Sequence, residues 1–227
     1  MLTMKTLKRN ATVKKQLPER YSIMITVYGY PNTRTSRVTW LLEELGLDYK
    51  YQLVDLMKGE GRSAEYRAIN PSGKVPALSD DELVLTESAA IMSYLGDKYY
   101  EASLVPSPGT AQRGLYDQWV CFAITELEQP LWTIGKHKFA LPKERRVPEV
   151  LETAAWEFQK ALKLLSAGLG DKNYILGNDF SAADIILGHT LFWGIGFKQP
   201  IEQKNLKDYI ERLKTRPSLL NAKKKEE

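Results

Sequence analysis

The stretch from Asn70 to Ser88, NPSGKVPALSDDELVLTES, contains residues that could bind a short peptide through its main chain. Pro76 interrupts an apolar segment with strand character, and proline cannot donate a hydrogen bond to a β-ladder. Pro76 therefore indicates an edge strand or a bulge, and a cis bond before it would turn the N–H and C=O of Val75 outward. An exposed backbone pair of this kind can accept an extended peptide as an added strand.

Glu87 and Ser88 follow the next apolar segment, at the point where helical spacing begins. The free N–H groups at a helix start and the Ser88 hydroxyl favour a carboxylate, and the Glu87 carboxylate favours an ammonium group. A purely structural interpretation makes Ser88 a helix cap, Glu87 a first-turn acid and Pro76 a protection of a sheet edge. Their combined spacing favours a site for a small peptide with a free amino-acid end, and glutathione has that structure.

The elements that must position these residues alternate between strand and helix. Apolar periodicity predicts strands at 22–28, 48–56, 74–78 and 83–85 and helices at 35–45, 62–69 and 87–99. The acidic SDDE turn joins the last two strands as a hairpin. This order predicts an α/β domain with a mixed four-stranded sheet over residues 23–100.

The composition changes after residue 100. Two prolines mark residues 101–109 as a linker, and helical patterning then dominates. The predicted helices span 115–127, 148–165, 182–191 and 206–213. We therefore expect an all-α bundle domain over residues 110–221.

Two local features of the second domain concern folding. The segment FSAAD predicts a capping box between Ser181 and Asp184, whose loss should cost about 1 kcal/mol. The terminal AKKKEE is expected to be a solvated, frayed end.

The net charge of +4 is concentrated near the N-terminus. Residues 1–22 carry six basic side chains against Glu19 alone, so this segment holds +5 and the remainder is close to neutral. We expect a disordered, dispensable extension here, with the ordered pattern starting near Met24. The neutral remainder gives no indication of nucleic-acid binding, and no apolar window is long enough for a membrane span. Because no secretion signal is evident, we expect a cytoplasmic protein.

Cys121 is the only cysteine, and His137 and His189 are the only histidines. A single cysteine excludes an internal disulfide, a CxxC redox pair and a cysteine-built metal centre. The two histidines lack ligand-like spacing, so we expect no metal cofactor. Cys121 is expected to be inert packing.

Several motifs occur in the order in which cytosolic glutathione S-transferases carry them. They are RVTWLLEELGLDY, NPSGKVPAL, LTES and FSAAD, and the resemblance extends from about Met24 to Leu220. The resemblance implies a thioredoxin-like N-terminal domain, an all-helical C-terminal domain and a homodimer. It also implies that glutathione is the co-substrate and that its thiolate attacks a small hydrophobic electrophile. The class stays open, but the chain is similar to bacterial-type members with a serine-, threonine- or asparagine-like activating residue.

The resemblance assigns the ends of glutathione to separate residues. Val75 corresponds to the backbone clamp on the cysteinyl unit, and Pro76 corresponds to the cis-proline of the family. Glu87 and Ser88 correspond to the residues that hold the γ-glutamyl group.

The glycine end of glutathione has a weaker correspondence. Arg62 and Lys74 occupy positions where the family often places groups that meet the glycine carboxylate. Gly61 stands where some relatives have a histidine, so one of the usual donors is missing.

Catalysis requires a group that stabilises the thiolate, since a free thiol of pKa about 8.5 is mostly protonated at pH 7. The family places this group between the first strand and the first helix, here the loop YGYPNTRTSRV. Counting back from the RV of the helix favours Thr33 first and Asn32 second. Lesser candidates are Ser36, Thr35 and Tyr28. The absence of a cysteine from this loop argues against thiol exchange through a protein mixed disulfide.

The electrophile is expected between the two domains, against apolar groups of the helical domain. The predicted walls are Tyr116, Trp119, Phe122 and Trp132, with Trp193 and Phe197 closing the end. Aromatic residues at helical spacing are more often core residues, so we expect only two or three of the six to contact the substrate.

Three functions are compatible with these residues. The favoured function is a glutathione transferase. A glutathione-dependent peroxidase, isomerase or dehalogenase would use the same scaffold, and a binding module could keep the fold without turnover. The complete set of Val75, Pro76, Glu87 and Ser88 argues against the binding module.

Overall fold

The computed structural model describes residues 24–227, so the extension expected at residues 1–22 lies outside the described part. Strands and helices alternate in its first half, as the sequence predicted. The elements are β1 (Ile25–Gly29), α1 (Thr35–Leu45), β2 (Tyr49–Leu53), η1 (Glu60–Arg62), α2 (Ala64–Ile69), β3 (Ala77–Asp80), β4 (Leu83–Thr86), α3 (Ser88–Lys98) and η2 (Tyr100–Ala102).

The strands of residues 24–227 form a mixed four-stranded sheet in the order β2-β1-β3-β4, which confirms the thioredoxin-like fold. β1 is parallel to β2 and antiparallel to β3, and β3 is antiparallel to β4. Ala77 at the start of β3 pairs with Tyr28 near the end of β1 and with Thr86 at the end of β4. This register brings the β1–α1 loop, Val75–Pro76 and Glu87–Ser88 to the same end of the sheet.

The second half of the chain is helical, which confirms the predicted bundle. Its elements are α4 (Ala111–Phe122), the π-helical η3 (Ala123–Glu128), α5 (Gln129–Gly135), the π-helical η4 (Lys136–Ala140), η5 (Lys143–Arg145), α6 (Val150–Leu169), α7 (Ala182–Gly196), α8 (Lys204–Lys214) and α9 (Pro217–Glu226). The sequence pattern missed the helical run after residue 128, because Pro130 and Gly135 are poor helix formers by propensity. Pro130 is the second residue of α5, which directly follows the π-helical η3.

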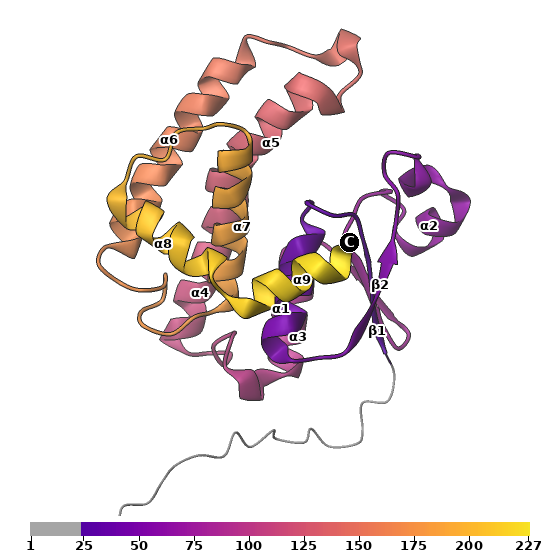
Figure 1. Cartoon of the computed structure of the whole chain (residues 1–227), viewed down its shortest axis with the longest axis horizontal. Coiled ribbons are helices and arrows are strands. Elements are labelled where there is room, and N and C mark those ends of the chain that lie inside the picture. Colours follow the sequence, from indigo (N-terminus) through magenta and orange to yellow (C-terminus); the bar gives the residue numbers. More distant parts are fainter. Residues whose placement is uncertain (1–23) are drawn as a thin grey trace, which may run out of the picture.

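The expectation of a frayed C-terminus was wrong. α9 runs back from the helical domain and lies against α1, with the C-terminal end close to β2 (Figure 1). Glu226 is only 5% exposed and accepts hydrogen bonds from Ser36 Oγ at 2.9 Å and Thr39 Oγ1 at 2.5 Å. Burial raises the pKa of Glu226, while these hydrogen bonds oppose the rise. Leu219 and Ala222 bury the apolar face of α9, so the lysine-rich segment is anchored by packing rather than by its own propensity.

The capping box at the start of α7 is present and has more partners than a cap requires. Asp184 accepts hydrogen bonds from the N–H and Oγ of Ser181, from the N–H of Ile175 and from the hydroxyl of Tyr209. Asp184 is fully buried, and burial raises its pKa while these donors oppose the rise. The motif therefore ties α7 to α8 and to the preceding loop in addition to starting the helix.

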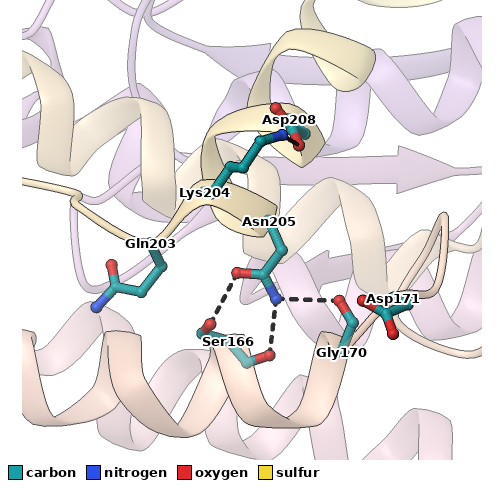
Figure 2. A pocket seen from close by; sticks show the side chains of 7 residues that line it. All are labelled: Ser166, Gly170, Asp171, Gln203, Lys204, Asn205 and Asp208. Atoms are coloured by element: carbon teal, nitrogen blue, oxygen red, sulfur yellow. Dashed lines mark hydrogen bonds and ion pairs between the residues drawn. The ribbon is translucent and has the colours of Figure 1, made fainter.

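A polar hollow of about 520 Å³ lies between the end of α6 and the start of α8 (Figure 2). Asn205 accepts a hydrogen bond from Ser166 Oγ at 2.7 Å and donates to the carbonyl oxygens of Ser166 and Gly170 at 2.9 and 3.0 Å. These bonds fix α8 on α6. None of the predicted site residues lines this hollow.

Helices that could span a bilayer are absent from residues 24–227, since none is both long and apolar enough.

Candidate functional site

Val75 offers an unpaired stretch of backbone at the sheet end. The Val75–Pro76 bond is cis, as predicted, and Val75 lies just before β3 begins. Within residues 24–227, neither the N–H nor the C=O of Val75 makes a hydrogen bond. The neighbouring Lys74 carbonyl, by contrast, accepts from Tyr66 Oη and Asn70 Nδ2, both at 2.6 Å. The backbone is thus held firmly up to Lys74 and is free for a ligand at Val75.

Glu87 and Ser88 lie beside this backbone, at the start of α3. Glu87 has a φ of 66°, an uncommon conformation for a residue other than glycine, and its side chain is exposed. Ser88 is the first residue of α3 and is 5% exposed. Its Oγ accepts a hydrogen bond from Arg37 Nη1 at 3.4 Å. The first N–H groups of α3 and the Ser88 hydroxyl favour a carboxylate here.

The β1–α1 loop, residues 30–34, presents Asn32 and hides the Thr33 hydroxyl. Thr33 Oγ1 donates to the Tyr30 carbonyl at 2.7 Å, so the Thr35 hydroxyl must donate the 2.9 Å bond between the two threonine oxygens. Asn32 has a φ of 59° and is exposed, and within the described residues its side-chain amide has no hydrogen-bond partner. Asn32 therefore offers a free, exposed donor in the loop.

Two of the lesser candidates for the activating group, Ser36 and Thr35, are engaged elsewhere. Ser36 donates to Glu226, and Thr35 is completely buried. The ring of Tyr28 packs against Tyr66 of α2, with 6.3 Å between the ring centroids.

Behind the loop lies a buried ionic cluster that the sequence did not predict. Arg37 is 1% exposed, forms an ion pair with Glu128 and donates to Thr190 Oγ1 at 3.0 Å. Arg34 Nε donates to the same carboxylate at 2.6 Å. Burial raises the pKa of Glu128, but the charges of Arg37 and Arg34 outweigh it and leave the pKa below its usual value. The only local signal was an arginine among the apolar positions of α1.

His189 joins this cluster to the loop. Its Nδ1 accepts from Arg37 Nε at 3.1 Å, and its Nε2 lies 2.9 Å from the Thr33 carbonyl oxygen. No local pattern assigned His189 a role, because its partners are 152 and 156 positions away.

The aromatic residues predicted as walls divide into two groups. Tyr116 is completely buried, so its assignment to an open pocket was wrong. Trp119 packs in T-shaped contact with Phe122 and against Gly168 of α6, where an added Cβ would lie 2.1 Å from the Trp119 ring. These contacts of Trp119 lie within the helical domain.

Two aromatic residues contact the loop through Arg34, Trp132 of α5 and Trp193 of α7, and two further rings pack behind them. The aromatic cluster comprises Trp132, Phe139, Trp193 and Phe197, whose neighbouring ring centroids lie 5.6–6.4 Å apart. The guanidinium of Arg34 lies over the rings of Trp132 and Trp193, 5.2 and 5.1 Å from their centroids. The cluster is partly exposed and adjoins the loop through Arg34.

Of the two residues predicted to meet the glycine carboxylate of glutathione, Arg62 lines a second hollow, of about 350 Å³. It is lined by Leu56, Met57, Lys58, Gly59, Gly61, Arg62 and Gly73, and Lys74 follows directly in the chain. A Cβ on Gly61 would lie 2.5 Å from the Gly73 carbonyl oxygen, which explains why this position cannot hold a histidine here. Arg62 and Lys74 are both exposed.

Within residues 24–227, no group of three or more His, Cys, Asp or Glu side chains is arranged to hold a metal ion. Cys121 is exposed on α4, so the expectation that it is packed was wrong.

The fold and the site together define a two-domain protein with a thioredoxin-like sheet and an appended helical domain. Residues 24–97 match the family model for the glutathione S-transferase N-terminal domain, and residues 148–193 match the C-terminal domain. Glutathione S-transferase GstB of Escherichia coli K12 is 31% identical over 202 residues, covering 86% of this chain and 96% of the relative. The chain belongs to the glutathione S-transferase family.

Solved structures agree with this assignment. A glutathione transferase from Methylococcus capsulatus is 29% identical with a TM-score of 0.80, over 89% of this chain and 98% of that one. A family member from Pseudomonas fluorescens, crystallised with two glutathione bound, is 26% identical with a TM-score of 0.78, over 90% of this chain and 94% of that one.

Proposed function

We propose that this chain conjugates the glutathione thiolate to small hydrophobic electrophiles. One observation carries the proposal: the unpaired Val75 backbone, the start of α3 at Glu87 and Ser88, and the free donors of the β1–α1 loop all lie at one end of the sheet. The names of the relatives, and the glutathione bound in the Pseudomonas fluorescens protein, support the same co-substrate.

In this proposal glutathione lies extended along the sheet end. Its γ-glutamyl carboxylate and ammonium groups meet Ser88 and Glu87, and its cysteinyl backbone pairs with Val75. The glycine carboxylate points toward Arg62 and Lys74. The thiol then faces the β1–α1 loop, and the electrophile packs on the aromatic cluster.

We propose Asn32 as the main side-chain donor to the thiolate. The Thr33 hydroxyl is a weaker candidate in the free protein, because its hydrogen is used by the Tyr30 carbonyl. Thr33 then acts mainly by shaping the loop. Hydrogen bonds to the charged form of the thiol lower its pKa, so each donor raises the thiolate fraction at neutral pH.

Asn32→Ala should therefore raise the pKa of the bound thiol by about one unit and lower kcat/KM about tenfold at pH 7. Thr33→Ala should have a smaller effect on the thiol pKa. The pH dependence of kcat/KM and the ultraviolet absorbance of the bound thiolate measure both quantities. An Asn32→Ala variant with the wild-type thiol pKa would exclude Asn32 as the donor and return Thr33 to first place.

Retention on immobilised glutathione and turnover of a chlorinated nitrobenzene test the function itself. The wild-type protein should bind and turn over. Binding without turnover of this substrate would contradict a general transferase, and turnover of an organic hydroperoxide instead would indicate a peroxidase. Failure to bind glutathione would overturn the proposal. We also propose the cytoplasm as its location, because glutathione keeps thiols reduced there.

We further propose that the chain forms a homodimer, as the family resemblance implies. β4 is an edge strand that carries exposed Leu83 and Val84. Apolar side chains on a sheet edge favour association. Light scattering after gel filtration should give twice the chain mass of 25.9 kDa, and Val84→Asp should shift it toward one chain. Leu164→Asp, at an exposed site on α6, is the matched control and should remain dimeric. A monomeric wild-type protein would disprove the dimer.

A further inference from the structure

The hydrogen-bond partners of His189 determine where its ring proton lies. Arg37 Nε can only donate, so His189 Nδ1, 3.1 Å away, must be the unprotonated acceptor. The hydrogen of the neutral ring is therefore on Nε2, 2.9 Å from the Thr33 carbonyl oxygen. His189 thus donates from the helical domain to the backbone of the β1–α1 loop.

The surroundings of His189 keep the ring neutral. Arg37 and Arg34 are the cationic groups that face it, and both are paired with Glu128. Burial lowers the pKa of His189 well below its ordinary value, and the two arginine charges lower it further. The same tautomer is thus present throughout the neutral pH range.

The Thr33 carbonyl connects the loop to both His189 and α1 by hydrogen bonds. It also accepts a hydrogen bond from the N–H of Ser36 at 3.1 Å, in the first turn of α1. The Thr33 carbonyl belongs to the peptide unit between Thr33 and Arg34, so its orientation fixes the plane of that peptide. Asn32 directly precedes Thr33 in the chain. A displaced carbonyl would shift the loop backbone that carries the Asn32 amide.

His189 is itself held by an anchored partner. Arg37 is bound by Glu128 and Thr190, and its Nη1 reaches Ser88 Oγ at 3.4 Å. A continuous series of contacts therefore runs from Ser88 through Arg37 and His189 to Thr33. It links the proposed γ-glutamyl end of the site to the proposed thiol end.

We propose that His189 is a positioning residue for the glutathione thiolate: its Nε2–H holds the Thr33 carbonyl and thereby orients the donors of the β1–α1 loop. It acts through the loop and does not touch glutathione. The inference rests on the proposed glutathione chemistry. In the alternative, the hydrogen bond from His189 to Thr33 only stabilises the packing of the two domains.

A matched pair of substitutions separates the two hydrogen bonds of His189. In His189→Asn, the amide oxygen replaces Nδ1 and still accepts from Arg37, but the donor to Thr33 is lost. In His189→Gln, the longer side chain places its NH₂ near the position of Nε2 and keeps the donor to Thr33. His189→Asn should raise the bound thiol pKa by about one unit and lower kcat about tenfold, with little change in the KM for glutathione. His189→Gln should restore most of the rate and the low thiol pKa.

Equal losses in the two variants with an unchanged thiol pKa would overturn the inference, and so would wild-type behaviour in both. If neither variant folds, nitrogen NMR of labelled histidine in the wild-type protein decides. It should show a neutral ring protonated at Nε2 between about pH 6 and 8, with the Nε2 signal shifted by added glutathione. A ring protonated at Nδ1 would overturn the inference. So would an Nε2 signal that stays unchanged when added glutathione shifts other resonances of the protein. A wild-type protein that neither binds glutathione nor turns over would instead disprove the proposed function.

Discussion

Replacing Glu128 with alanine should lower the free energy of unfolding by about 3–5 kcal/mol. The substitution leaves the Arg37 guanidinium, which is 1% exposed, without its only carboxylate partner in residues 24–227. An uncompensated buried charge is among the most destabilising changes that a core can receive, because desolvation of the ion is no longer offset by attraction. Arg34 loses the same partner, but its side chain is 29% exposed and can be solvated.

Chemical denaturation measures this effect, and Glu126→Ala is the control. Glu126 is exposed on the same π-helical segment, so its removal should change stability by no more than about 0.5 kcal/mol. The double variant Arg37→Met with Glu128→Leu should recover much of the loss, since apolar pairs often replace buried ion pairs without cost. A Glu128→Ala protein as stable as the Glu126→Ala protein would show that Arg37 is solvated in solution.

The acid sensitivity of the protein should reflect the same carboxylate. The folded-state pKa of Glu128 lies below its usual value of about 4.3. Its contribution to stability is therefore complete above the unfolded-state pKa and is lost as the pH falls through the lower folded-state pKa. Glu128→Gln should make stability less dependent on pH in this acidic range. If stability fell with decreasing pH as steeply in this variant as in the wild type, the pH dependence would come from other carboxylates.

Asp184→Ala should also cost about 3–5 kcal/mol, well above the value of about 1 kcal/mol expected from a helix cap alone. The carboxylate accepts four hydrogen bonds at 2.7–2.8 Å from Ser181, Ile175 and Tyr209. Its removal would leave several buried donors without partners, and each unsatisfied group costs about 1–3 kcal/mol.

Asp179→Ala is the matched control for this prediction, because Asp179 is exposed and lies in the loop before α7. Its midpoint of unfolding should stay near that of the wild type. A double-mutant cycle of Asp184→Ala with Tyr209→Phe should give a coupling energy of about 1–2 kcal/mol, since the Tyr209 hydroxyl donates to this carboxylate at 2.7 Å. If Asp184→Ala cost no more than a simple cap, the α8 contact would contribute nothing to the domain.

The sequence by itself determined the features that depend on contiguous residues. Strand and helix periodicity gave the order of elements in the sheet domain, since alternation and the 3.6-residue repeat are local properties. Glu87 and Ser88 identified the start of α3. Pro76 was expected inside an edge or bulged strand at 74–78, and this was wrong, because β3 begins at Ala77 and lies between β1 and β4. Pro76 precedes the strand, so its missing N–H removes no hydrogen bond from the ladder. The proposed glutathione site was predicted from Pro76, Glu87 and Ser88 together with Val75.

Tertiary structure alone decided the contacts between helices. Arg37 meets Glu128 and His189 across 91 and 152 positions, and the four aromatic rings near the loop come from three separate elements. Which face of α5 and α7 turns toward the loop depends on how the helices rotate and cross, and this is set by packing of the whole core rather than by local spacing. For the same reason the sequence placed Tyr116 at the site although it is buried, and could not show that the Thr33 hydroxyl turns inward while Asn32 stays free.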